Sequence, residues 1–300
     1  MTKNNLKIIF IGTSEFAVSA LKALIKNNYD IKAVITSPDK PMGRKQEITP
    51  TPIKRVAKEY NLPILQPEKI LDIKSEITNL KPDLIIVSSY GKIIPKSILD
   101  IPLLECLNIH PSLLPKYRGS SPIQTAILNG DKTTGITIML MDEKMDHGPI
   151  VSQMKIDIEP SENYKDLEKR LSQESGSFLI KILPQYLNNE IKPQIQNESE
   201  ASYTKILSRE QGEIDLNKSA KEIERMIKAF YPWPGTWFYL NKKRIKIIKA
   251  KTSIKKQETS IKTGKDFLIL ELVQPEGKKT MTGEEFFRGY KKQLDLKKII

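Results

Sequence analysis

The sequence predicts an α/β protein in which a mostly parallel sheet is followed by a small β-rich domain. Over about the first 190 residues, short apolar runs alternate with stretches of helical period, which is typical of a parallel sheet. One run, DLIIV at residues 83–87, is apolar throughout, as expected of a strand buried on both faces. In the last hundred residues short β-like runs dominate, so we expect a separate small sheet there.

The elements of the first part can be placed in order from caps and apolar runs. A first strand is expected at residues 7–11, followed by a helix that Ser14 can cap. A second strand, at 31–35, leads into a long loop, SPDKPMGRKQEITPTP, with four prolines. Thr51 then caps a helix that has Pro52 at its first position. The remaining elements expected here are strands at 63–65, 83–87, 106–109, 135–141 and 150–156 and helices at 122–129 and 164–189.

The stretch at residues 191–201 is polar and has no hydrophobic period, so it is expected to link two domains. We therefore predict domains at 1–190 and 206–300, joined by a linker at 191–205. The second domain should begin with a helix, and its strands should follow. These elements are expected at 219–230 for the helix and at 237–240, 244–248 and 267–273 for the strands.

The positive charge of the chain is concentrated in its last third. Of the net charge of +13, residues 201–300 hold +11, with 23 Lys+Arg against 12 Asp+Glu. Such a segment suits a polyanionic partner, but it also fits the solvated surface of a lysine-rich protein, and charge alone leaves both open. Alternation in the strand at 244–248 predicts two faces: Arg244, Lys246 and Ile248 on an exposed one, and Ile245, Ile247 and Lys249 on the other.

Composition excludes several classes of protein. No run of about 18 apolar residues occurs, so no transmembrane helix is expected, and the short apolar run before Gly12 suits a first strand better than a signal peptide. The single Cys106 rules out an intramolecular disulfide and argues for a reducing compartment. No Cys/His spacing suggests a metal site. A nicotinamide dehydrogenase is excluded because Gly12 is not followed by the G-x-G-x-x-G pattern.

Asn108 and His110 stand near the end of a predicted central strand, where a period of two puts both side chains on one face. Ligands of open parallel sheets bind beyond the carboxyl ends of the strands. An amide N–H beside an imidazole is suited to stabilising an oxyanion. A structural role is the alternative, in which Asn108 ends the strand with a local hydrogen bond and His110 packs in the core.

The second of the two histidines, His147, lies in an acidic turn between two predicted strands. This turn, MDEKMDHGPI, also carries Asp142, Glu143 and Asp146. A carboxylate that reaches an imidazole orients it and favours its charged form. An ordinary solvated turn is the alternative. The Asn-x-His pair, the rigid loop after it and an acidic turn about 36 residues further on are more specific together than apart.

Five segments carry a resemblance to a known family: IIFIGTSEFA, VSSYGKIIP, LNIHPSLLPKYRGSSPIQ, TGITIMLMDEKMDHGPI and YPWPGTW. In this order and spacing, from about Leu6 to Lys279, they resemble the folate-dependent formyltransferases. The second domain and the long loop point to the methionyl-tRNA formyltransferase family among them. The resemblance implies a Rossmann-like sheet followed by an OB-like C-terminal β-barrel.

The resemblance also implies roles for individual residues. Three match the family's catalytic residues: Asn108, His110 and Asp146. Two stretches match its folate-binding loops: Ser112, Leu113, Leu114 and Pro115, and Tyr90, Gly91, Lys92 and Ile93. Arg44 matches a basic residue of an insertion that approaches the tRNA acceptor end. The densest basic stretch is then assigned to tRNA as well: Lys242, Lys243, Arg244 and Lys246.

The implied activity is transfer of the formyl group of 10-formyltetrahydrofolate to the α-amino group of initiator methionyl-tRNA, which serves translation initiation. This chemistry needs no metal and no covalent enzyme intermediate, so Cys106 is expected to pack in the sheet as a small apolar group. The implied partners are folate and tRNA, with no membrane. The resemblance further implies a monomer in the bacterial cytosol or in an organelle of bacterial origin.

The chain departs from the family pattern at three places. His147 stands where a smaller residue, often Thr, is usual, and Tyr231 stands where Asn is usual. The stretch between Ala250 and Phe267 is short, which puts the closure of the barrel in question.

Three other functions stay open at this point: a formyltransferase acting on a small amine, an RNA-binding protein with an inactive α/β domain, and a formyl-folate hydrolase. The first would keep the Asn, His and Asp residues but would not need the basic segment.

Overall fold

The computed structural model describes residues 6–43 and 45–290, which form two compact units. Unit 1 takes in the described residues up to Pro122, together with Thr133–Asp157 and Glu168–Thr204. Unit 2 takes in Ile123–Lys132, Ile158–Leu167 and the described residues from Lys205 onward. The boundaries at 190 and 206 stay a prediction.

Unit 1 is built on a seven-stranded sheet of order β5-β2-β1-β6-β7-β8-β9. The pairs from β5 to β7 are parallel, and β8 and β9 add two antiparallel strands at one edge, so the predicted mostly parallel sheet is confirmed. Its strands are β1 (Lys7–Gly12), β2 (Asp30–Ile35), β5 (Ile64–Leu65), β6 (Leu84–Ser88), β7 (Cys106–His110), β8 (Thr133–Leu140) and β9 (Ile150–Asp157). All five residues of β6 and of β7 are buried, as expected of central strands covered on both faces.

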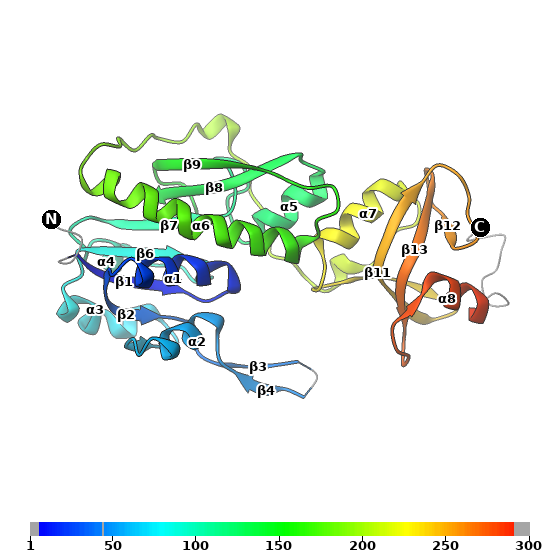
Figure 1. Ribbon diagram of the computed structural model, residues 1–300, viewed down its shortest axis with the longest axis horizontal. Helices are drawn as coiled ribbons and strands as arrows, with labels where there is room; N and C mark the ends of the chain where they lie inside the picture. Colours follow the sequence, from blue (N-terminus) through cyan, green and yellow to red (C-terminus); the bar gives the residue numbers. More distant parts are fainter. Residues whose placement is uncertain (1–5, 44, 291–300) are drawn as a thin grey trace. The chain divides into compact units, whose positions relative to one another are not determined.

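The helices of unit 1 cover this sheet, and Figure 1 shows α6 lying over it beside α1, roughly along the strand direction. Contact between the two helices is close because Gly176 of α6 has no side chain: a Cβ there would lie 2.7 Å from the carbonyl oxygen of Ser19. The helices are η2 (Glu15–Ala17), α1 (Val18–Lys26), α2 (Pro52–Glu59), η3 (Ile70–Ile73), α3 (Lys74–Leu80), α4 (Lys96–Leu99), η4 (Glu198–Glu200) and α6 (Tyr164–Leu187), which enters unit 1 at Glu168. The capping of α2 by Thr51 is confirmed, since its side chain accepts the N–H of Lys54.

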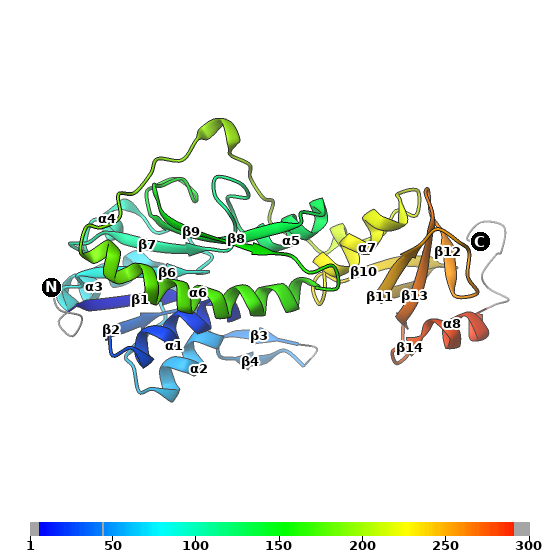
Figure 2. The same ribbon diagram turned by 45° about the horizontal axis from the view of Figure 1, so that its top comes forward.

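The proline-rich segment expected to be a loop contains an antiparallel hairpin, β3 (Lys40–Met42) and β4 (Glu47–Thr49). Figure 2 shows the hairpin projecting from unit 1. Asp39, just before it, is paired with Lys54 of α2. The hairpin was missed because each of its strands has only three residues, too few for an alternation of apolar and polar residues to stand out. Arg44 lies outside the described residues.

Unit 2 is built on a separate antiparallel sheet of five strands. They are β10 (Thr236–Leu240), β11 (Lys243–Ser253), β12 (Ser260–Lys262), β13 (Phe267–Pro275) and β14 (Met281–Thr282). Within the described residues the sheet is open, because β10 and β12 lie at opposite ends of the order β10-β11-β13-β12 and do not pair. The predicted OB-like barrel is therefore not seen as a closed sheet.

The core of unit 2 lies between this sheet and two helices, α7 (Ala220–Ala229) and α8 (Gly283–Tyr290). The unit also contains α5 (Pro122–Asn129) and η5 (Glu210–Gly212). Helix α7 starts with a capping box formed by Ser219 and Glu222. As predicted, Ile245 and Ile247 of β11 are buried in this core. The prediction for Lys249 was wrong: it is exposed, because a bulge between Ile247 and Ala250 breaks the alternation of the strand.

Candidate active site

Asn108, His110 and Asp146 lie together at the carboxyl end of β7. The alternation of the strand puts Asn108 and His110 on one face, and the turn after β8 brings Asp146 to them. Nδ2 of Asn108 donates to Oδ1 of Asp146 at 3.2 Å, and Nδ1 of His110 lies 3.6 Å from Oδ2 of the same carboxylate. The strand and the turn thus meet although 38 residues separate Asn108 from Asp146.

Both ring nitrogens of His110 face oxygen atoms. Nε2 lies 3.0 Å from the main-chain carbonyl oxygen of Tyr117, and Nδ1 faces the Asp146 carboxylate. A carbonyl only accepts hydrogen bonds, so Nε2 is the donor in the contact with Tyr117. The 3.6 Å separation from the Asp146 carboxylate exceeds a direct hydrogen bond.

The carboxylate of Asp146 is held in place from a third side. Its Oδ2 accepts the main-chain N–H of Gly119 at 2.7 Å. Gly119 has φ 113°, and a Cβ there would lie 2.6 Å from Oγ1 of Thr204, so the position requires glycine. Asp146 itself has φ 49°, a left-handed conformation that Asp tolerates better than most residues.

The predicted folate loop at residues 112–115 is fixed to β8 and β9. Thr137 of β8 donates from Oγ1 to the carbonyl of Ser112 and accepts the N–H of Leu114. Gln153 of β9 donates to the carbonyl of Leu114 and to Thr137. Sequence reasoning missed Thr137 and Gln153, although a polar residue inside an apolar strand such as TGITIML is a signal for such a role.

Leu113 of this loop packs against the backbone of β8 at Gly135. A Cβ on Gly135 would lie 2.4 Å from Cδ2 of Leu113 and 2.3 Å from the carbonyl oxygen of Met154. Only glycine allows the loop and the two strands to approach this closely. The position of residues 112–115 therefore depends on Gly135.

The second predicted folate stretch, Tyr90 to Ile93, follows β6. Tyr90 is buried in the core, and burial raises the pKa of its hydroxyl. Gly91 has φ 74°, which favours glycine. Lys92 donates from Nζ to the carbonyls of Pro67 and Glu68, whereas the side chain of Ile93 is exposed.

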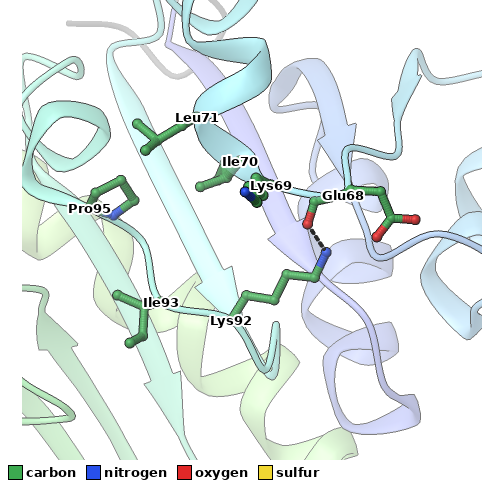
Figure 3. Close-up of a pocket in the computed structure, with 7 residues that line it drawn as sticks. All are labelled: Glu68, Lys69, Ile70, Leu71, Lys92, Ile93 and Pro95. Atoms are coloured by element: carbon green, nitrogen blue, oxygen red, sulfur yellow. Dashed lines mark hydrogen bonds between the residues drawn. The ribbon is translucent and has the colours of Figure 1, made fainter.

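Lys92 and Ile93 also border an open hollow of about 320 Å³ (Figure 3). Its floor is mostly apolar, and η3 forms the opposite wall. The residues that line it are Glu68, Lys69, Ile70, Leu71, Lys92, Ile93 and Pro95.

His147, the neighbour of Asp146 in the chain, is engaged elsewhere. Its Nδ1 pairs with Asp142 at 2.5 Å, and its Nε2 lies 3.4 Å from Oε1 of Glu198. Both ring nitrogens are therefore directed at carboxylates other than Asp146.

Cys106 begins β7 and is buried, and burial raises the pKa of its thiol to about 12. A thiol in this state is a poor nucleophile at neutral pH. The position suits the expected role of Cys106 as a small apolar group in the sheet.

Comparison with known proteins assigns the chain to a family. The family model for formyl transferase matches residues 6–183, and that for the formyl transferase C-terminal domain matches residues 206–291. A methionyl-tRNA formyltransferase of Thermodesulfovibrio yellowstonii is 42% identical over 95% of this chain and 96% of its own. The chain belongs to the methionyl-tRNA formyltransferase family. A second member, from Bacillus subtilis, is 38% identical over 94% of both chains.

A solved structure of a sugar-related N-formyltransferase complex shares the fold. It is an N-formyltransferase from Helicobacter canadensis in complex with folinic acid and dTDP-3-aminofucose. With 22% identity, it aligns with a TM-score of 0.68 over 88% of this chain and 98% of its own.

The basic stretch attributed to tRNA in this formyltransferase lies on β11 and the turn before it. Lys242 is in the turn, and Lys243 and Arg244 are exposed at the start of β11. Arg244 is opposite the exposed Tyr239 and lies over the ring of Trp237, 5.6 Å from its centroid. A surface with cationic and aromatic side chains side by side suits nucleic acid.

Two further features of the described residues bear on partners of this formyltransferase. None of their helices combines the length and the apolar character that a membrane span needs. No group of three or more metal-binding side chains occurs among residues 6–43 and 45–290.

Proposed function

We propose that this chain transfers the formyl group of 10-formyltetrahydrofolate to the α-amino group of initiator methionyl-tRNA, yielding formyl-methionyl-tRNA for translation initiation. The observation that carries the proposal is the mutual contact of Asn108, His110 and Asp146 in a chain of the methionyl-tRNA formyltransferase family. The use of folate as formyl donor is consistent with the folinic acid bound in the Helicobacter canadensis structure.

The reaction is a direct acyl transfer. The neutral amine nitrogen attacks the formyl carbon, and a tetrahedral centre with a negative oxygen forms. The bond between the formyl carbon and N10 then breaks. The amine loses one proton and N10 gains one, so tetrahydrofolate and formyl-methionyl-tRNA leave without a net change in protons. No step of this sequence calls for a metal or an enzyme nucleophile.

Asn108, His110 and Asp146 each have a separate role in this reaction. Asn108 has a second amide N–H besides the one given to Asp146, and this donor can stabilise the developing oxyanion. In its protonated form His110 would supply positive charge at the same place, beside the Asp146 carboxylate. Asp146, whose carboxylate faces Nδ1 of His110, can pass protons between the amine and N10 through water.

Folate binding is proposed for the two loops that flank this trio. Residues 112–115 are held rigidly by Thr137 and Gln153, so a pterin ring would meet a preformed surface. The stretch Tyr90 to Ile93 lies after β6, the strand next to β7, and so belongs to the same carboxyl edge of the sheet.

Binding of tRNA is proposed for Arg44 and for the basic stretch of unit 2, which comprises Lys242, Lys243, Arg244 and Lys246. Their positive charge suits phosphates, and the exposed Tyr239 adds a stacking surface. We further propose that residues 206–300 close into an OB-like barrel, that the chain acts as a monomer, and that it works in the cytosol.

The test is incubation of the purified chain with 10-formyltetrahydrofolate and methionyl-tRNA, followed by detection of formyl-methionine. Formyl-methionine should accumulate with tetrahydrofolate in a one-to-one ratio. Parallel reactions with a dTDP-amino sugar and without acceptor separate the alternatives. Formylation of the sugar alone would mean a small-amine enzyme, and formate release without acceptor would mean a hydrolase.

A further inference from the structure

The segment after α6 that connects the two predicted domains does more than connect them. Residues 194–204, here called the strap, follow α6 in the chain (Figure 1) and form bridges with Ile150 of β9 and with Arg118. The strap begins with two main-chain hydrogen bonds between Gln194 and Ile150 of β9, of 2.7 and 2.8 Å. It ends beside Arg118, whose main chain bonds to Ser202 and Thr204.

Gln196 of the strap is buried and holds the turn that carries Asp146. Its Nε2 donates to the main-chain carbonyls of Asp146 and Gly148, at 2.9 and 2.8 Å. Its Oε1 accepts two N–H groups of Arg118, at 3.1 and 2.9 Å. The orientation of the amide is unambiguous, because carbonyls only accept and a guanidinium only donates. The amide of Gln196 thus donates two hydrogen bonds and accepts two, so all its hydrogen-bonding positions are used.

Arg118 is the largest fully buried side chain of the described residues. Its guanidinium joins Gln196 to Glu198 and Tyr203 of the strap. The hydrogen bonds from Arg118 lower the pKa of the Glu198 carboxyl. Burial of an arginine costs free energy unless all its donors are satisfied, and here three strap residues satisfy them. A buried arginine that binds three strap residues beside the active site indicates a role in positioning that site.

The strap also fixes the other side of His110. Ser202 accepts the main-chain N–H of Tyr117 at 2.9 Å, and its own carbonyl accepts the N–H of Arg118 at 2.8 Å. The carbonyl of Tyr117 is the group that faces Nε2 of His110. One segment thus holds both the acceptor for Nε2 and the turn that brings the carboxylate to Nδ1.

We infer that Gln196 and Arg118 are positioning residues of the formyl-transfer reaction, which set the place of the Asp146 carboxylate relative to His110. The inference rests on the proposed function. Gln196 acts on the main chain of Asp146, and Arg118 acts through Gln196. Neither side chain is expected to touch folate or the amine.

The first test is Gln196→Ala, assayed for formyl transfer. Displacement of a reacting group by about 1 Å costs on the order of 10²-fold in rate, so kcat should fall by about that factor while KM for folate changes little. The matched control is Gln66→Ala, which also removes two hydrogen bonds donated by a glutamine, to the carbonyl of Ser37 and to Asp39. The control should retain the wild-type kcat.

A double-mutant cycle separates positioning from general loss of stability. If Gln196 acts through Asp146, then Gln196→Ala should change kcat within about twofold once Asp146→Asn is present. A merely structural role predicts the same fold-loss in both backgrounds, and that result would overturn the inference. Arg118→Lys provides a second variant: lysine keeps the charge but cannot donate in a fork to Gln196 and Glu198 together, so kcat should also fall.

A readout without catalysis keeps the inference distinct from the proposed function. The chain has two histidines, so NMR of the imidazoles gives two signals, which His147→Thr assigns. Gln196→Ala should move the His110 signal, and Gln66→Ala should not. An unmoved His110 signal in Gln196→Ala would contradict positioning even in a protein that transfers no formyl group. If the wild type forms no formyl-methionine while the His110 signal moves, the proposed function fails and the positioning stands.

Discussion

Nδ1 of His110 lies 3.6 Å from Oδ2 of Asp146, which is within reach of electrostatic attraction but beyond a direct hydrogen bond. On the other side of the ring, Nε2 is bonded to the carbonyl of Tyr117. Nε2 is therefore hydrogen-bonded, whereas Nδ1 makes no direct hydrogen bond to Asp146. This arrangement predicts which of the two histidines matters for catalysis.

Replacement of His110 by Ala should lower kcat by on the order of 10²–10³, with little change in folate affinity, because charge stabilisation in the transition state is lost. Asn108→Ala should behave likewise. His147→Ala is the matched control, since His147 is directed at Asp142 and Glu198 instead. Single-turnover rates and folate titrations would check this, and near-normal turnover of both His110→Ala and Asn108→Ala would show that catalysis lies elsewhere.

Asp146→Asn keeps the size of the side chain and removes its charge. The carboxylate accepts hydrogen bonds from Asn108 and from the N–H of Gly119, and an amide can accept them with only one of its two terminal atoms. We expect kcat to fall by at least about 10²-fold, since the negative charge that faces His110 is lost. Asp142→Asn serves as the control, and a similar loss in the two variants would argue against a special role for Asp146.

That Asn108, His110 and Asp146 lie together was predictable from the sequence. Asn108 and His110 share a strand with a period of two, and Asp146 stands in a turn whose spacing from them belongs to the family pattern. The strap was not predictable, because its hydrogen bonds join Gln196 to groups about 50 residues away and Arg118 to residues about 80 away. A polar segment without period gives no sign of such contacts, and arginine is seldom fully buried.

For the fold, too, features with a local signal were predictable and features that depend on distant strands were not. Apolar runs such as that of β6 identify the central strands, because a strand buried on both faces consists of apolar residues almost throughout. Lys249 was assigned to the wrong face because its exposure depends on a bulge against β13, which involves a strand some twenty residues further on.

Gly135→Ala should weaken folate binding. The added methyl group would collide with Leu113 and with the carbonyl oxygen of Met154, so the loop at 112–115 must move or β8 and β9 must separate. We expect KM for 10-formyltetrahydrofolate to rise more than kcat falls, as measured by steady-state kinetics. Gly289→Ala in α8 is the control, because a Cβ there meets no atom within 4 Å. Equal KM values in the wild type and Gly135→Ala would rule out this loop as a folate contact.

Cys106→Ala should retain full formyl transfer and change the dependence of stability on pH. The pKa of the buried thiol is raised to about 12, whereas an unfolded thiol titrates near 8.5. A raised folded pKa gives stability that is present below the unfolded pKa and lost as pH rises toward the folded one. Between pH 7 and 10 the wild type should therefore lose about 2 kcal/mol more unfolding free energy than Cys106→Ala. Urea denaturation at the two pH values measures this difference, and identical losses would mean that the thiol ionises in the folded protein.

The basic stretch of unit 2 distinguishes a tRNA substrate from a small amine. Arg244 stands opposite Tyr239 and Lys246 opposite Trp237, on the face of the sheet away from the core that holds Ile245 and Ile247. Each phosphate contact that releases a counterion contributes a log–log slope of about −0.7 to −0.9 to the salt dependence of tRNA affinity. The double variant Arg244→Gln with Lys246→Gln should therefore weaken tRNA binding and flatten this slope by about one to two units, and folate binding should not change.

The control for that variant removes the same charge from unit 1, at Lys169 and Lys181 on the exposed side of α6. Filter binding or fluorescence titration between about 50 and 200 mM salt, the range over which phosphate contacts lose most affinity, gives both slopes. If the two double variants flatten the slope equally, tRNA responds only to the net charge of the protein. If KM for methionyl-tRNA does not respond to salt in the wild type either, the positive charge of unit 2 is a solvated surface, and a small amine becomes the better acceptor.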